Sequence, residues 1–198
     1  MLKNIFKAAS QSSARISVFH DFHRPPYGGG NQFMLALTSE FEKNGYKIER
    51  NKLSDATEVC LFNSFNFDSR KLIASKHVSS TLMIHRVDGP VDKYRGDERG
   101  VDSEIWKMNQ SIANATIFQS QYSLDAHIEL GMQFRRPTVI KNSVDSTIFY
   151  PSEKDFSSQS GKIKLISTSW SDNINKGASV YQWLEQNLDW DRFEYTFV

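Results

Sequence analysis

Three successive glycines, Gly28, Gly29 and Gly30, lie between a strand-like run at residues 15–22 and a helix-like run at residues 32–43. Glycine carries no Cβ atom, so the backbone can pass close to a ligand. The helix that follows presents unpaired N–H groups and the positive end of its dipole beside Asn31. This arrangement predicts a site for a phosphate or another anion. The alternative is a tight turn for close packing, although one glycine would be enough for a turn.

A second polar segment, His85-Arg-Val-Asp-Gly-Pro90, follows an apolar run. In open α/β sheets, ligands bind beside the carboxyl ends of the strands. His85 is therefore a candidate general acid or base, and the alternative is a structural histidine at the end of a strand. Arg86 can pair either with a phosphate or with Asp88.

Two further segments combine polar groups with predicted strand ends. Asn142 and Asp145 follow the run at 138–142 and either contact a ligand or form a turn. The pair Lys176-Gly177 begins a helix after the run at 162–168, where hydroxyl groups, N–H groups and a lysine can hold a diphosphate. A solvated loop is the alternative for this last segment.

Other kinds of site fit the sequence poorly. A dinucleotide fingerprint would place a third glycine where Phe33 stands, and Glu49 is only a weak candidate for a ribose-binding acid. His20, Asp21 and His23 are possible metal ligands, but no residue completes a set with recognisable spacing. No metal and no cofactor are expected.

Composition narrows the class of protein. The chain has 198 residues, and 39% of them are hydrophobic, which is enough for a core. Its net charge of +1 argues against a nucleic-acid partner. The single cysteine, Cys60, excludes an internal disulfide framework and indicates a reducing, cytoplasmic setting. No apolar run reaches the roughly 18 residues of a membrane helix. Residues 1–9 are cationic and amphipathic, so peripheral membrane contact stays open beside a frayed extension.

Apolar strand-like runs alternate with helix-like runs along the chain. The strand-like runs do not alternate polar and apolar residues, which is typical of strands buried on both faces of a parallel sheet. We therefore predict an α/β fold, a Rossmann-like parallel sheet with helices on both faces. The expected strands are 15–22, 46–50, 57–63, 81–86, 115–120, 138–142, 162–168 and 193–198, and the expected helices are 32–43, 68–75, 102–113, 123–130 and 176–188. Asp102 and Ser123 are predicted N-caps.

The predicted organisation has four parts. Residues 1–14 form an extension, 15–151 a first domain, and the Ser-rich stretch 152–161 a linker. Residues 162–198 supply only strand, helix and strand, which is the start of a second, incomplete Rossmann-like βαβ unit. We expect the chain to be a truncated two-domain protein.

The order of these motifs resembles that of the retaining, nucleotide-sugar-dependent glycosyltransferases of family 4. The resemblance runs from about residue 16 to residue 198. It rests on the glycine-rich loop after the first strand, His85-Arg-Val-Asp-Gly-Pro90, Ala115-Thr-Ile-Phe-Gln-Ser-Gln-Tyr-Ser123, Val139-Ile-Lys-Asn-Ser-Val-Asp145 and Lys176-Gly177. No single motif is decisive, but their order is specific.

The resemblance implies a GT-B fold of two Rossmann-like domains and hexosyl transfer in glycan biosynthesis, from a nucleotide-diphosphate sugar to a glycan or lipid acceptor. The loop 28–30 would lie near the donor diphosphate and the acceptor, and His85 near the transferred sugar. Asn142 and Asp145 match an Asn-Gly-Val-Asp element, and Lys176-Gly177 matches a pair that contacts the diphosphate. The first domain would be the acceptor side, and residues 162–198 the start of the donor-binding domain.

Three departures leave independent activity open. Ser143 replaces a glycine, and Trp170-Ser171 stands where a Gly-Arg pair often lies. The family's Glu-x7-Glu element would lie beyond Val198, so a partner domain or subunit would have to complete the donor site. The alternative function is a non-catalytic or split-subunit binding module. A nucleotide-dependent oxidoreductase is a third hypothesis, against which Phe33 speaks.

Overall fold

The computed structural model describes residues 14–25, 27–95, 100–144, 149–151, 161–169 and 177–198. Their contacts divide them into two compact units, one within residues 1–92 and 98–142 and the other within 93–97 and 143–198. Each unit is described by itself. In the part of the chain that the structure describes, no helix has the length and apolar character that crossing a membrane requires.

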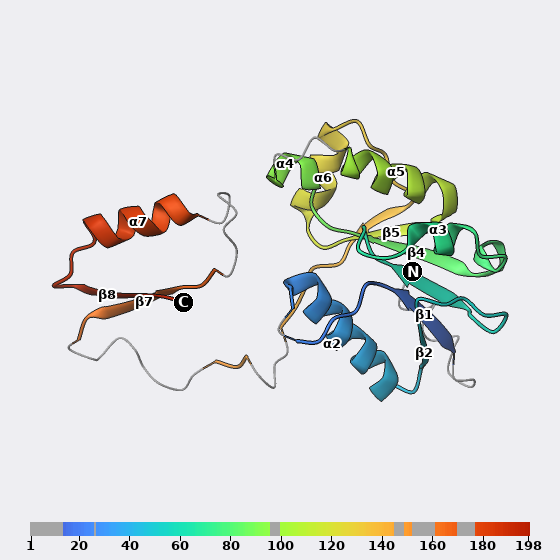
Figure 1. Cartoon of the computed structure of the whole chain (residues 1–198), viewed down its shortest axis with the longest axis horizontal. Coiled ribbons are helices and arrows are strands. Elements are labelled where there is room, and N and C mark those ends of the chain that lie inside the picture. Colours follow the sequence, from blue (N-terminus) through green and yellow to red (C-terminus); the bar gives the residue numbers. More distant parts are fainter. Residues whose placement is uncertain (1–13, 26, 96–99, 145–148, 152–160, 170–176) are drawn as a thin grey trace. The chain divides into compact units, whose positions relative to one another are not determined.

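The first unit is built on a six-stranded sheet with the order β2-β1-β3-β4-β5-β6 (Figure 1). Every neighbouring pair of strands is parallel. The predicted α/β class with a Rossmann-like parallel sheet is therefore confirmed. The strands are β1 Arg15–Phe19, β2 Lys47–Arg50, β3 Val59–Phe62, β4 Leu82–Val87, β5 Ala115–Phe118 and β6 Pro137–Val139.

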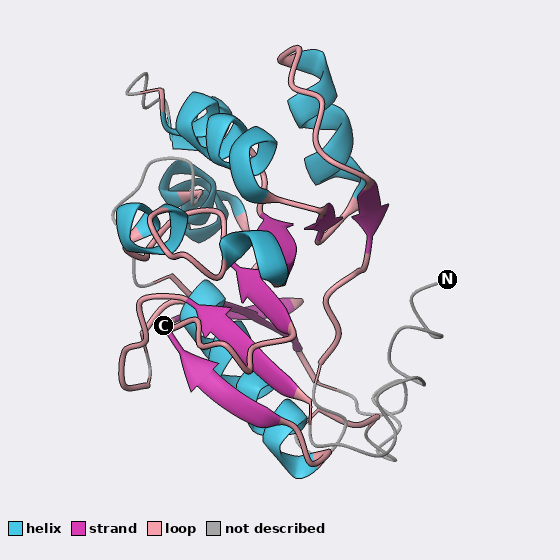
Figure 2. Cartoon of the chain, turned by 90° about the vertical axis from the view of Figure 1, so that its right-hand side faces the viewer, coloured by secondary structure: helices cyan, strands magenta, loops and turns pink. Residues whose placement is uncertain are grey.

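Helices cover both faces of this sheet (Figures 1 and 2). Helix α2 (Gly29–Lys43) packs Met34 against Ile16, Val18 and Leu61 on one face. The opposite face packs against α3 (Ser69–Ile73), α5 (Val101–Ile112) and α6 (Gln121–Glu129). The core strands are apolar on both faces because both faces are covered, which explains their continuous apolar runs.

Several predicted boundaries were wrong. Helix α2 begins at Gly29, so two of the three glycines lie in its first turn and not before it. Strand β4 runs from Leu82 to Val87 and not from 81 to 86. The N-caps are Gly100 for α5 and Ser120 for α6, in place of the predicted Asp102 and Ser123. Two short elements, the 3-10 turn Val78–Ser80 and α4 (Val91–Arg95), were not predicted.

Asp102 has a different role from the one predicted. Its carboxylate oxygens accept hydrogen bonds from the backbone N–H groups of Val91 (2.8 Å) and Asp92 (2.9 Å). Both groups lie in the first turn of α4, where the helix supplies no acceptor of its own. Asp102 therefore caps α4 and not its own helix.

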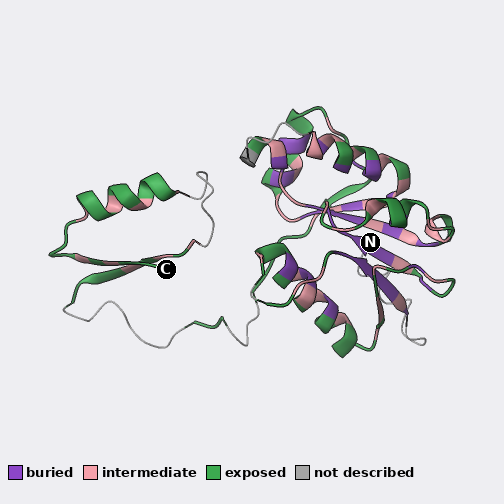
Figure 3. Cartoon of the chain, in the orientation of Figure 1, coloured by how far each residue is buried: buried purple, intermediate pink, exposed green. Residues whose placement is uncertain are grey.

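The second unit contains β7 (Ile163–Ser167), α7 (Ala178–Asn187) and β8 (Phe193–Phe197), and its two strands are parallel. Gly177 is the N-cap of α7 with φ 87°, a left-handed conformation that favours glycine. Figure 3 shows mostly exposed residues along this unit and buried ones along the sheet of the first unit. The strand, helix and strand expected here are present.

Candidate functional site

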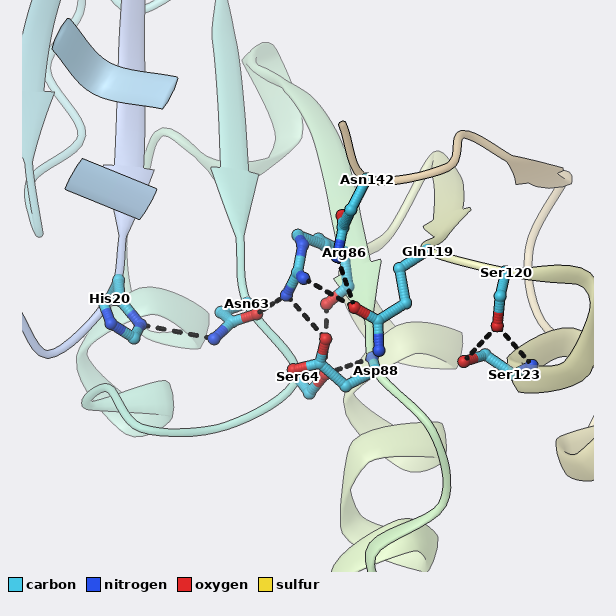
Figure 4. Close-up of polar contacts among 9 residues, drawn as sticks. All are labelled: His20, Asn63, Ser64, Arg86, Asp88, Gln119, Ser120, Ser123 and Asn142. Carbon is cyan, nitrogen blue, oxygen red and sulfur yellow. Dashed lines mark hydrogen bonds and ion pairs between the residues drawn. The ribbon is translucent and has the colours of Figure 1, made fainter. Parts of the chain in front are cut away.

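A chain of polar side chains crosses the carboxyl edge of the sheet (Figure 4). It joins His20 after β1, Asn63 after β3, Arg86 in β4, Gln119 after β5 and Asn142 after β6. The linking distances are 3.3 Å from His20 Nδ1 to Asn63 Nδ2, 2.9 Å from Arg86 Nη1 to Asn63 Oδ1, 3.2 Å from Arg86 Nη2 to Gln119 Oε1 and 2.9 Å from Asn142 Nδ2 to Gln119 Oε1. Parallel strands bring these residues together because their carboxyl ends meet at one edge.

Arg86 is the centre of this chain. Its side chain is 4% exposed, and its Nη1 lies 2.8 Å from Asp88 Oδ1. Its guanidinium carbon lies 4.4 Å from the centre of the Phe33 ring, which belongs to α2. Of the two pairings that the sequence allowed for Arg86, the structure has the one with Asp88. The charge of Arg86 is thus balanced within the protein.

Ser64 fixes the turn that carries Asp88. Its hydroxyl donates to the carbonyl oxygen of Arg86 at 3.2 Å and accepts from the backbone N–H of Asp88 at 2.8 Å. Ser64 is 1% exposed, whereas the Asp88 side chain is 30% exposed. Asp88 is therefore held by Arg86 and Ser64 on its buried side, and its carboxylate is partly open to solvent.

Two asparagines hold the loop after β1. Asn51 accepts from the N–H of His20 (2.9 Å) and donates to its carbonyl oxygen (2.7 Å). Asn31 makes the same pair of bonds with the backbone of His23, both at 2.9 Å. Asn31 is buried, so its observed role is to clamp this loop, and the predicted ligand contact stays a prediction.

We expect Asn51→Ala to lower the free energy of unfolding by about 1–3 kcal/mol. The change removes both clamp bonds and leaves alanine at φ 52°, where asparagine and glycine are favoured. Asn66→Ala is a matched control, because Asn66 has φ 64° but an exposed side chain. Urea unfolding of both variants separates the clamp from the backbone strain. Equal losses in the two variants would contradict the clamp.

The glycine segment opens α2 at the same edge. Gly28 is its N-cap with φ 50°, and Gly29 and Gly30 form its first residues. A Cβ atom at any of these three glycines would meet nothing within 4 Å. The first N–H groups of a helix have no acceptor within it. The segment therefore offers backbone donors on an open surface.

His85 lies in the core beneath the edge. It is fully buried, its ring stacks on Phe62 at 4.4 Å, and its Nδ1 lies 3.1 Å from Asn109 Nδ2. Burial lowers the pKa of His85 to about 3, so the ring is neutral near pH 7. Strand β4 ends at Val87, one residue beyond the predicted 86, and its alternation points His85 and Arg86 to opposite faces. The His85 side chain has no exposed surface, and its catalytic role stays a prediction.

His20 and Glu49 also have structural partners. Burial lowers the pKa of His20, while Asp21 acts in the opposite direction. Burial opposes ionisation of Glu49, but hydrogen bonds from Thr57, Ser54 and Arg15 leave its pKa lowered overall. Glu49 is thereby held by the loop after β2 and by Arg15 of β1.

Over the described residues, no group of three His, Cys, Asp or Glu could hold a metal ion.

The structure gathers only part of the predicted site. Arg86, Asp88 and Asn142 belong to the polar chain at the sheet edge. Gly177 belongs to the second unit, and Asp145 and Lys176 lie outside the described residues. Three members of this site were not predicted from the sequence, namely Asn63, Ser64 and Gln119. The pattern that could have identified them is a polar residue that follows an apolar strand, since Asn63 and Ser64 follow β3 and Gln119 follows β5.

The edge thus combines a buried ion pair, three side-chain amides and the N-termini of two helices. Ser120 caps the second of these, α6, by accepting from the N–H of Ser123 at 3.1 Å (Figure 4). Such groups bind oxygen-rich ligands by hydrogen bonds and dipoles. In comparisons with known proteins, no family model, no curated protein and no solved structure matches the chain.

Proposed function

We propose that this chain is part of a glycosyltransferase. The enzyme would transfer a hexosyl group, with retention, from a nucleotide-diphosphate sugar to a glycan or lipid acceptor. Metal is not required by the chemistry, because backbone N–H groups and helix dipoles can stabilise the charge that develops on a leaving diphosphate.

One observation carries the proposal. The open glycine start of α2 and the polar chain belong to one site, because Phe33 lies one turn after Gly29 and packs on Arg86 at 4.4 Å. An anion held by the first turn of α2 would therefore sit beside groups suited to a sugar or its acceptor. Asp88 already balances Arg86, and the N-terminus of α6 is capped by Ser120, whereas that of α2 has no side-chain cap. We therefore assign the diphosphate to the N-terminus of α2.

The first test measures, by saturation-transfer NMR, whether the chain binds nucleotide sugars that carry uracil, guanine or adenine. We expect at least one to bind, and we expect Gly29→Leu to weaken its binding about tenfold or more, since the side chain covers the N–H donors. The open space around Gly29 lets the variant fold. Ala36→Leu places the same side chain at an exposed position of α2 and should leave the affinity unchanged.

Two results would count against the proposal. If no nucleotide sugar binds, the donor class is wrong. If one binds but Gly29→Leu and Ala36→Leu retain equal affinity, the diphosphate does not lie at the start of α2. Thermal unfolding of both variants shows whether a loss of binding reflects a loss of fold.

The second candidate is a non-catalytic or split-subunit binding module. The burial of His85 favours it, because the residue expected to act nearest the transferred sugar has no exposed surface. Release of nucleoside diphosphate distinguishes the two functions. Binding of a nucleotide sugar without any release, with sugar acceptors present, would favour the module.

A further inference from the structure

The polar groups at the sheet edge form two layers. The inner layer consists of His20, Asn63, Ser64 and Arg86, each between 1% and 4% exposed. The outer layer consists of Asp88, Gln119 and Asn142, which reach solvent to different degrees. Asn63, Ser64 and Arg86 bond to one another and to the outer layer. His20 bonds Asn63 through Nδ1, and its buried Nε2 has no hydrogen-bond partner among the described residues. The inner layer can therefore orient the outer layer, but its atoms are too deeply buried to meet a ligand.

The inner layer fixes the orientation of the Gln119 amide. Its Oε1 accepts from Arg86 Nη2 at 3.2 Å and from Asn142 Nδ2 at 2.9 Å (Figure 4). Both lone pairs of this oxygen are then used. The Nε2 group, with two N–H donors, has no partner among the described residues. Gln119 therefore offers donors to a ligand.

The other two members offer acceptors. Asn142 donates through Nδ2, which leaves its Oδ1 as an acceptor. Asp88 uses Oδ1 for Arg86, and its Oδ2 has no partner in the described part of the chain. Asp88 and Gln119 both bond to the Arg86 guanidinium, and Asn142 bonds to Gln119, so the three groups lie together. The outer layer thus mixes N–H donors with oxygen acceptors in one place.

The charge balance of this surface argues against a phosphate ligand, which an unpaired arginine would suggest. Arg86 is buried and balanced by Asp88, and a phosphate could recruit it only by breaking bonds to Asn63, Asp88 or Gln119. Leaving such buried partners unpaired is costly. A hydroxyl group, in contrast, can accept from Gln119 and donate to a carboxylate or amide oxygen at once.

We propose that the outer layer binds a neutral, polyhydroxylated ring, such as a sugar or a cyclic polyol. Gln119 donates to its hydroxyl oxygens, and Asp88 and Asn142 accept from its hydroxyl groups. The identification of this ring as the acceptor of glycosyl transfer rests on the proposed function, whereas its binding does not. Gln119 then determines specificity, because a site built to bond hydroxyl groups rejects ligands that lack them.

The test uses methyl glycosides of glucose, galactose and mannose, together with myo-inositol, as probes in saturation-transfer NMR. We expect Gln119→Met to weaken the best probe about tenfold, since it keeps the side-chain length and removes the N–H donors. Gln119→Glu removes the same donors but keeps oxygens for Arg86, and so covers the case in which the methionine variant misfolds. Gln121→Met is the control, because Gln121 bonds Asp125 on the exposed side of α6.

Three outcomes would overturn the inference. These are no saturable signal from any probe, equal affinity in wild type and both Gln119 variants, and displacement of the probe by inorganic phosphate. Nucleotide-sugar binding is measured in parallel on the same samples. If the probe binds but no nucleotide sugar does, the result contradicts the proposed function alone. If a nucleotide sugar binds but no probe does, the result contradicts this inference alone.

Discussion

Arg86→Met should lower the free energy of unfolding by about 3–5 kcal/mol, the range for breaking a buried ion pair. The variant leaves the Asp88 carboxylate without its cation, and the oxygens of Asn63 and Gln119 each lose a charged donor. It also removes the guanidinium from the Phe33 ring. Urea unfolding at pH 7 measures the loss.

A double-mutant cycle with Asp88→Asn shows whether the pair itself is responsible. We expect the double variant to lose less than the sum of the two single losses, since it removes both charges. Arg15→Met is the control, because Arg15 also pairs with a carboxylate, that of Glu49, but is 35% exposed. Its loss should be about 1 kcal/mol or less. A loss for Arg86→Met as small as the Arg15 loss would contradict the central role of Arg86.

The fold was predictable because its signals are local. Runs such as 59–62 are apolar throughout, and helical spacing between them indicates a sheet covered on both faces. The strand ends were harder to place. The strand predicted at 81–86 is observed as β4 Leu82–Val87, which is a shift of one residue at each end. The sequence did not show how deeply His85 would be buried, because its contacts with Phe62 and Asn109 are tertiary.

The site was predictable only in part, for a related reason. Arg86, Asp88 and Asn142 follow from the rule that ligands bind at the carboxyl edge of a parallel sheet. Which residues meet there depends on register, and the register places Phe62 beside His85 and Val87 beside Phe118. That alignment brings Asn63 and Gln119 to Arg86. Sequence spacing does not reveal such a register, because the connections between these strands differ in length.

His85 supplies the sharpest contrast between the two interpretations of this edge. A histidine near a transferred sugar should titrate near its ordinary pKa or bind ligand, whereas burial holds the pKa of His85 at about 3. The unfolded chain takes up a proton below about pH 6.5, and the folded protein does so only near pH 3. The stability that His85 contributes is therefore fully present above pH 6.5 and is lost as the pH falls from 6.5 toward 3.

We expect wild-type stability to fall more steeply than that of His85→Leu between pH 7 and pH 5, by about 2 kcal/mol from this one proton. The leucine variant should itself be less stable at pH 7, because it loses the stacking on Phe62 and leaves the Asn109 amide with one partner fewer. Urea unfolding at the two pH values gives the difference. NMR titration of the His85 ring should show no protonation between pH 8 and pH 5. A ring that titrates near pH 6.5 would instead mean that His85 reaches solvent, and would restore the catalytic role that the sequence predicted.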